Sequence, residues 1–238
     1  MGESDAAGPG GIEARILEAA GQALIHYGYD KTTMDDIARA AGVSKSAIYA
    51  RWKNKDALLE AVVWHEGQRY TAEWLARVEA DPAGGTFHGI YRHALAALKD
   101  NPMMAAIMRR DRRLLGSYLR RASVENLFRQ RMALLRFFLK GLQDAGAVRQ
   151  DVDVDVVAYA ANCLSYGYLM MGEIVPPEET PPLDDTLAVM VEMLERLLTP
   201  PDGGDSEAGK QVVRAFMAQI RERVQAAALG DSQRATAG

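Results

Sequence analysis

The stretch Tyr29–Leu59, YDKTTMDDIARAAGVSKSAIYARWKNKDALL, contains the signals that decide the first part of the fold. Two short helical patterns are joined by Ala-Gly-Val, and hydroxyl and basic side chains gather around the second pattern. Thr33 is placed to cap the first helix, with Asp36 three residues on in a weaker form of the capping box. Gly42 supplies the positive backbone dihedral that ends this helix, and Ser44 caps the next. The stretch therefore predicts a helix, a sharp turn and a second, very short helix.

The same stretch is basic, although the chain of 238 residues has a net charge of −4. Between Lys31 and Lys55, six basic side chains are opposed by only Asp35 and Asp36. A basic segment in an acidic protein indicates a local site for phosphate groups rather than general binding to polyanions.

Side chains that can bind DNA lie in register around the second short helix. Its first turn carries Lys45, Ser46 and Ala47. Lys45 can donate a hydrogen bond to the edge of a guanine, Ser46 can bind either type of base, and Ala47 can contact the methyl group of a thymine. Tyr49 lies one turn further on, and Lys55 lies where a fourth helix begins and a phosphate is favoured. The alternative is a small helical domain with solvated lysines, but the caps and the turn glycine in register favour DNA binding. The predicted DNA contacts are Thr33, Ser44, Lys45, Ser46, Ala47, Tyr49, Lys53 and Lys55.

The run TT-x-x-x-IA-x-x-AGVS-x-x-x-IY-x-x-W-x-x-K-x-x-LL, read from Thr32 to Leu59, resembles the DNA-binding head of the TetR family of bacterial transcriptional regulators. The resemblance covers a small part of the chain, but many positions match in order. It implies phosphate contacts from Thr33, Tyr49 and Lys55, and a place along the base edges for Ser44–Ala47. It also implies a homodimer whose variable body holds an effector in an internal cavity.

Helical periodicity dominates the rest of the chain, and no alternating strand pattern is found. We expect an all-α fold with a three-helix helix-turn-helix head and a larger helical body for effector binding and dimerisation. The expected parts are a disordered tail (1–11), the DNA-binding domain (12–58), the ligand-binding and dimerisation domain (59–200), and a linker with a C-terminal amphipathic helix that packs on the body (201–238). After the head, we expect helices at about 55–79, 86–99, 102–120, 123–145, 153–174, 183–198 and 206–229.

Two late helices are the expected pairing surface of the homodimer. The helix at 153–174 is apolar nearly all round, so it must be covered on every side. The helix at 183–198 has one apolar stripe. Both helices would also suit the core of a monomer, and the pairing role is what the family resemblance adds. The predicted interface residues are Val157, Leu164, Tyr168, Leu187, Val191 and Leu194.

The effector cavity that the resemblance implies is expected to be lined by Tyr91, Met104, Met108, Phe137, Asn162, Tyr166 and Met170. A methionine or aromatic residue at helical spacing also suits plain core, so Asn162 is the most informative of these. Its amide lies in an apolar run, where it needs a partner from the protein, water or a ligand. The effector is expected to be lipophilic or anionic. The basic cluster Arg109–Arg113 with Arg120 and Arg121 is either a solvated face or a site for an anionic effector.

Several function classes are disfavoured. Cys163 is the single cysteine, so no internal disulfide can form, and we expect a reducing cytoplasm and a small buried side chain. His88 and His93 are five residues apart, off the spacing of a helical zinc pair. The N-terminus lacks the features of a signal peptide, and Val156–Gly172 falls short of the roughly 20 apolar residues of a membrane span. We therefore expect no enzyme, no metal, no cofactor and no membrane partner.

These features predict a homodimeric repressor that leaves a near-palindromic double-stranded DNA operator when an unknown small-molecule effector binds its body. The alternative is a dimeric DNA-binding or scaffold protein without an effector.

Overall fold

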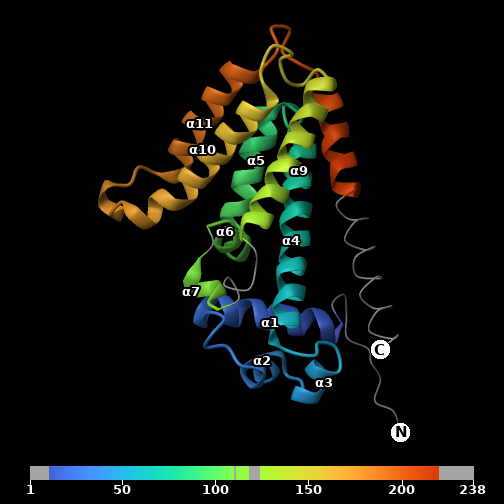
Figure 1. Cartoon of the computed structure of the whole chain (residues 1–238), viewed down its shortest axis with the longest axis vertical. Coiled ribbons are helices and arrows are strands. Elements are labelled where there is room, and N and C mark those ends of the chain that lie inside the picture. The colour runs from blue at the N-terminus through green and yellow to red at the C-terminus, as the bar shows by residue number, and fades with distance from the viewer. Residues whose placement is uncertain (1–10, 110, 118–123, 220–238) are drawn as a thin grey trace. The chain divides into compact units, whose positions relative to one another are not determined.

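The computed structural model of the chain describes residues 11–109, 111–117 and 124–219 (Figure 1). Within these ranges every regular element is a helix, which confirms the predicted all-α class. The helices are α1 (Ile12–Tyr27), α2 (Met34–Ala41), α3 (Lys45–Tyr49), α4 (Lys55–Ala80), α5 (Phe87–Lys99), α6 (Pro102–Arg109), α7 (Arg112–Leu115), α9 (Val124–Asp144), α10 (Val154–Ile174), the short 3-10 helix η1 (Pro177–Glu179) and α11 (Leu183–Leu198), and residues 206–219 are also helical.

The chain divides into two compact units. The first comprises Met1–Tyr70 and Leu98–Leu127, and the second comprises Thr71–Ala97 and Phe128–Gly238. This division differs from the predicted boundary after residue 58, because α6 and α7 belong with the head rather than with the body. The long helix α4 contributes its first part to the first unit and its second part to the second.

One hydrophobic core holds the head together. Its most deeply buried side chains come from α1, α2, α3 and α4 in turn, with Ile16 and Ile48 at 0% exposure and Ile37 and Leu58 at 1%. Each such burial contributes about 1.5–3 kcal/mol. Because α3 has only five residues, its position depends on this packing and on its caps rather than on its own helical propensity.

The single helix predicted at 102–120 is wrong, since α6 and α7 are separate elements. Asp111 begins the second of them, where its carboxylate accepts hydrogen bonds from the backbone N–H of Arg113 at 2.7 Å and of Leu114 at 3.2 Å. An aspartate in this capping position marks the start of a new helix, so Arg113 does not continue the helix that contains Arg109. Arg109 and Arg113 therefore lie on different helices, and Arg110, Arg120 and Arg121 lie outside the described residues.

The helix α7 is fastened to the loop between α1 and α2. The backbone N–H of Tyr29 donates to the carbonyl of Leu114 at 2.8 Å, and the hydroxyl of Ser117 donates to Asp30 at 2.8 Å. Gly28, with φ of 78°, lies so close to this segment that a Cβ there would be 2.2 Å from the Arg113 carbonyl oxygen. A glycine is therefore required at position 28 both by the backbone angle and by space.

In the second unit, α10 and α11 run side by side, and the helix of residues 206–219 lies along α9 and the end of α4 (Figure 1). The rings of Phe138 and Phe216 are 4.9 Å apart, and Val213 is completely buried. Arg214 donates to both carboxylate oxygens of Glu79 at 2.7 Å. The rest of the helix predicted at 206–229 lies outside the described residues, as does nearly all of the predicted tail. In the described part of the chain, no helix has the length and hydropathy to cross a membrane.

Candidate nucleic-acid interface

The start of α2 is fixed by a complete capping box, as the sequence predicts. The hydroxyl of Thr33 accepts from the backbone N–H of Asp36 at 3.2 Å, and the Asp36 carboxylate accepts from the backbone N–H of Thr33 at 3.3 Å. The hydrogen bond with the Thr33 side chain lowers the pKa of Asp36 below its usual value. Thr33 itself stays exposed, so its hydroxyl lies at a helix N-terminus that is open to an anion.

The turn between α2 and α3 has the geometry that the sequence predicts. Gly42 lies in the left-handed region with φ of 66° and ψ of 37°. A Cβ at this position would meet nothing within 4 Å, so the backbone angle alone, and not crowding, calls for glycine. The N–H of Val43 closes the turn by donating to the carbonyl of Ala38 at 3.0 Å.

The helix α3 has one side in the core and one side in solvent. Ser44 caps it by accepting from the backbone N–H of Ala47 at 3.2 Å, and Ile48 anchors it in the core. Lys45 and Ser46 are exposed on its first turn, and Tyr49 is 46% exposed one turn later. This is the arrangement of a recognition helix, in which the first turn reaches base edges.

The structure gives Lys55 a different environment from the one the sequence suggests. Its ammonium donates to the carbonyl of Tyr29 at 2.8 Å and to that of Thr32 at 3.0 Å, instead of extending freely into solvent. An ammonium has three N–H donors, so one remains for a phosphate. Lys53, two residues earlier, is exposed.

One electrostatic contact on this surface was not foreseen from the sequence. Lys45 lies 2.9 Å from Asp35, and this carboxylate raises the pKa of Lys45 through their hydrogen bond and charge attraction. The two residues are ten positions apart on different helices, so local pattern offers no signal for the contact. The other exposed cations between Lys31 and Lys55 are Lys31, Arg39, Arg51 and Lys53.

The residues predicted to line an effector cavity are divided between the two units. Met104 and Met108 belong to the first unit and are half-buried. In the second unit, Phe137 and Tyr166 are 58% and 46% exposed. These two side chains are therefore open to solvent rather than enclosed, because their helices present them on an outer face. Met170 is half-buried.

Tyr91 and Asn162 are the polar candidates that the structure encloses. The buried hydroxyl of Tyr91 is 3.2 Å from the hydroxyl of Ser165, which is also 2.8 Å from the carbonyl of Ala161. The side-chain oxygen of Asn162 is buried and has no hydrogen-bond partner among the described residues. A buried acceptor without a donor is unfavourable by about 1–3 kcal/mol. This position is therefore suited to a donor group from water or a ligand.

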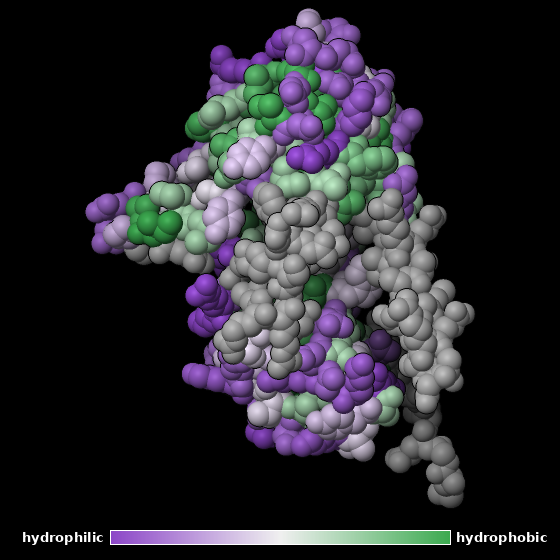
Figure 2. All heavy atoms as spheres, in the orientation of Figure 1, coloured by the Kyte–Doolittle hydropathy of each residue, from purple (hydrophilic) through white to green (hydrophobic). Residues whose placement is uncertain are grey.

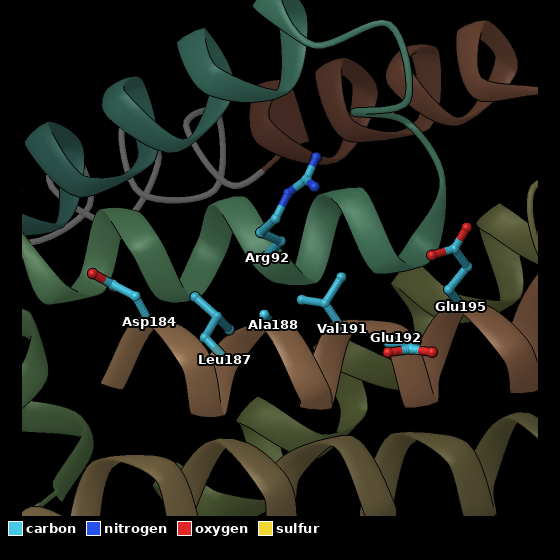
Figure 3. A pocket seen from close by; sticks show the side chains of 7 residues that line it. All are labelled: Arg92, Asp184, Leu187, Ala188, Val191, Glu192 and Glu195. Atoms are coloured by element: carbon cyan, nitrogen blue, oxygen red, sulfur yellow. The ribbon is translucent and has the colours of Figure 1, made fainter. Parts of the chain in front are cut away.

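A shallow pocket of about 250 Å³ lies between α5 and α11, and none of the predicted cavity residues lines it. Figure 3 shows Arg92 on α5 and, facing that helix from α11, Asp184, Leu187, Val191 and Glu195. Ala188 and Glu192 complete the lining. Three carboxylates and one guanidinium make this pocket unsuited to an anionic effector.

The predicted dimer residues are mostly buried inside the chain itself. Val157, Tyr168, Leu187, Val191 and Leu194 are all less than 9% exposed, and Leu164 is half-buried. The exposed large apolar side chains of α10 and α11 lie at neighbouring positions instead: Val156, Tyr159, Tyr166, Met171, Ile174, Val189, Met193 and Leu197. Figure 2 shows hydrophobic surface at the tip where α10 leads towards α11. The exposed apolar face of α10 and α11 is therefore formed by other residues than the predicted ones.

Cys163 lies on this outer face, which corrects the expectation of a buried thiol. Helix α10 is nearly all apolar, so the sequence alone does not show which side is covered. His93 lies 2.8 Å from Asp81, and His88 lies beside Thr86. Among the described residues, no group of three or more His, Cys, Asp or Glu side chains is arranged to hold a metal ion.

Comparisons with known proteins match the head most clearly. Residues 16–62 match the family model described as bacterial regulatory proteins, tetR family. The DNA-binding transcriptional repressor TetR of Mycobacteroides abscessus is 46% identical over 50 residues, which are 21% of this chain and 26% of that protein. The chain spans only about a quarter to a third of the length of the curated relatives that it matches.

Solved structures match over a much larger share of the chain. The Bacillus subtilis regulator FadR in complex with stearoyl-CoA has a TM-score of 0.55 and 17% identity over 76% of this chain and 96% of that one. AibR in complex with isovaleryl coenzyme A and operator DNA has a TM-score of 0.53 and 22% identity over 76% and 97%. At these identities the likeness shows a shared fold for head and body.

Proposed function

The chain carries the DNA-binding head of the TetR family of bacterial transcriptional regulators and belongs to that family, and on this premise we propose that it is a homodimeric repressor released from its operator by a small effector. The observation that carries the proposal is the capped α2–Gly42–α3 arrangement, which leaves Lys45, Ser46 and Tyr49 exposed on one short helix. A regulator of this kind acts on chromosomal DNA, so the cytoplasm is its place of action.

In the proposed complex, α3 lies in the major groove and its first turn reads base edges. Lys45 and Ser46 supply donors for guanine or for either base type, and Ala47 contacts a thymine methyl group. The exposed hydroxyls of Thr33 and Tyr49 bind phosphates on either side of the groove, with Lys53 and the third N–H of Lys55. The phosphate contacts position the protein on the DNA, and the first turn of α3 determines which base sequence it prefers.

Pairing is supported by the exposed apolar face of α10 and α11. Ile174 is 68% exposed, and Val189 and Met193 are 59% and 55% exposed. Contiguous apolar surface of this kind marks interaction sites rather than ordinary solvent-facing helices. Two heads that bind successive faces of the major groove lie roughly 34–36 Å apart and call for a near-palindromic operator.

The proposed effector has an apolar part and an anionic part. FadR and AibR, which share the fold, are crystallised with acyl-coenzyme A molecules, and such a ligand combines both properties. In this chain, the buried oxygen of Asn162 is available for a donor group of the ligand. Effector binding would shift α4, whose first residue Lys55 contacts the loop that leads into α2, and so weaken the hold on DNA.

The effector part of the proposal is tested by thermal shift against acyl-coenzyme A molecules of increasing chain length, with free coenzyme A as the control. A stabilising acyl-coenzyme A that also lowers operator affinity supports an effector-released repressor. If no acyl-coenzyme A stabilises the protein, the proposed effector class is wrong. If a wider screen of lipophilic and anionic metabolites also finds no stabilising ligand, the alternative of a DNA-binding protein without an effector is favoured.

The DNA part is tested by selecting sequences from a random duplex library and measuring their affinity by fluorescence anisotropy. We expect an enriched near-palindrome bound by two chains. Lys45→Ala should change base preference at one position of each half-site, at a loss of about 1–3 kcal/mol. Tyr49→Phe should weaken all sequences alike. A protein that enriches no sequence and binds all duplexes with equal weakness would overturn the proposal.

A further inference from the structure

Lys45 and Asp35 form an ion pair that joins the two helices of the helix-turn-helix. Lys45 is the first residue of α3, and Asp35 lies in the first turn of α2. Their charged atoms are 2.9 Å apart, yet both side chains remain open to solvent, with 48% of Lys45 and 62% of Asp35 exposed. The pair therefore lies at the reading end of the recognition helix and can be reached by another molecule.

The fold has little need of this pair. An ion pair between exposed side chains contributes little to stability. The N-terminus of α2 is already satisfied by the capping box of Thr33 and Asp36, and that of α3 by Ser44. An additional carboxylate on a surface that faces phosphates also opposes DNA binding through charge repulsion. Asp35 is thus unfavourable for general DNA affinity unless a base supplies it with a donor.

We propose that Asp35 and Lys45 act together as the reader of a single G·C base pair in each half-site, which makes Asp35 a specificity-determining residue. This inference rests on the proposed function and adds a base preference to it. Lys45 would donate to O6 and N7 of guanine, and Asp35 would accept from the N4 amino group of the paired cytosine. One Asp35 oxygen is occupied by Lys45, and the other is free for the cytosine.

The donor and the acceptor of the Lys45–Asp35 ion pair match the order of acceptors and donor along the major-groove edge of one G·C base pair. In the major groove, guanine presents two neighbouring acceptors and the adjacent cytosine presents a donor. An ammonium uses one of its three N–H bonds for Asp35 and has two left for the two guanine acceptors. An A·T pair presents its acceptors on either side of the adenine amino group, so it cannot offer two neighbouring acceptors to Lys45. The fixed side-by-side order of donor and acceptor also distinguishes G·C from C·G.

The test uses the full-length protein and the duplex obtained by selection. Each position of one half-site is replaced by all four base pairs. Affinities are then measured at one fixed salt concentration for the unmodified protein, Asp35→Ala, Lys45→Ala and the double variant. The unmodified protein should prefer G·C at one position by roughly tenfold or more. Asp35→Ala, which removes both the charge and the acceptor, should bind mixed-sequence DNA more tightly but lose most of this preference.

Two controls separate base reading from charge. Glu18→Gln removes one exposed negative charge from α1 in the same head and should leave the preference unchanged. In the double variant, the loss of preference should be smaller than the sum of the two single losses, because both residues read the same base pair. Melting curves of all variants verify that the head remains folded.

If Asp35→Ala keeps the full preference at every position, Asp35 reads no base and the inference is overturned. A preferred A·T pair at the position that depends on Asp35 would overturn it as well. In both cases the protein would still bind a specific sequence, so the proposed function would stand. If the unmodified protein selects no sequence at all, the proposed function fails, and this inference fails with it.

Discussion

The ammonium of Lys55 lies 4.1 Å from the centroid of the Tyr29 ring and donates to the carbonyl oxygen of the same residue at 2.8 Å. A second hydrogen bond, to the Thr32 carbonyl, spans 3.0 Å. One cation at the start of α4 therefore holds the loop that leads into α2. The other side of this loop is held by α7, through the bond from the Tyr29 N–H to the Leu114 carbonyl.

Replacing Lys55 with methionine should weaken both folding and DNA binding. The carbonyls of Tyr29 and Thr32 would lose a charged donor, so we expect the free energy of unfolding to fall by about 1–3 kcal/mol. Urea denaturation measures this change. The matched control is Lys53→Met, which removes an exposed cation and should leave stability unchanged while reducing the salt dependence of DNA binding by about one unit. An unaltered unfolding free energy in Lys55→Met would show that the two carbonyls do not depend on Lys55.

The capping box of α2 gives a second prediction. Thr33→Val removes the hydroxyl that accepts from the Asp36 N–H, and the free energy of unfolding should fall by about 0.5–2 kcal/mol. Thr33→Ser keeps the hydroxyl and should therefore retain most of this stability. It should also retain the phosphate contact proposed for position 33. Equal stability of the valine and serine variants would contradict a capping role.

The lowered pKa of Asp81 should make the stability of the protein depend on pH. Burial tends to raise its pKa, but hydrogen bonds from His93, the Ala83 N–H and Arg92 outweigh this effect and hold the pKa below its usual value of 3.8. The ionised carboxylate therefore stabilises the fold above pH 3.8, and this contribution is lost as the pH falls through the lower pKa of the folded state. Asp81→Asn should be less stable than the unmodified protein at pH 7 and lose less stability on acidification. Parallel curves of unfolding free energy against pH for the two proteins would refute this assignment.

Because the backbone packs closely around Gly85, adding a single methyl group at this position should destabilise the protein. A Cβ at Gly85 would lie 1.7 Å from the carbonyl oxygen of Ser206, where the helix of residues 206–219 begins. Gly85→Ala should destabilise the protein by about 1–3 kcal/mol and increase amide exchange in that helix. Gly67→Ala is the control, because a Cβ in this part of α4 meets nothing within 4 Å and should stabilise the helix by up to about 1 kcal/mol. Unchanged exchange in Gly85→Ala would mean that the C-terminal helix is not docked there.

The outer face of α10 and α11 gives a prediction about assembly. Val189→Glu with Met193→Glu places two charges on the exposed apolar face and should convert the proposed dimer to monomers in sedimentation experiments. Gln211→Glu, an exposed position in the C-terminal helix, changes the charge without touching this face and should leave the dimer intact. A double glutamate variant that sediments as a dimer would place the pairing surface elsewhere.

The head could be predicted residue by residue because its signals are local. Thr33, Gly42 and Ser44 act within three or four residues of themselves, through caps and a turn whose geometry depends little on the rest of the chain. The contact between Lys45 and Asp35 could not be predicted in this way, since it depends on how α2 and α3 pack.

The segments after the helix-turn-helix were less predictable, for physical reasons that differ between segments. Helix α10 is apolar on nearly all sides, so periodicity did not show that Val157 is buried while Val156 is 64% exposed. The division of the segment 102–120 did have a signal, the capping Asp111 followed by Gly116 with φ of 49°, but the surrounding helical pattern obscured it. The effector residues depend on which surfaces face one another, and a single sequence contains little information about that.

Site-directed DNA cleavage can show whether α3 lies in the major groove of the operator. An iron chelate attached to Ala50→Cys, an exposed position at the end of α3, is compared with one on Ala72→Cys in α4. Both are made in a Cys163→Ser background, because the natural thiol is exposed. If α3 lies in the major groove, position 50 should give two clusters of cuts, one within each half-site of the selected operator, and position 72 should give no such clusters. Uniform or equal cutting from both positions would contradict this placement of α3.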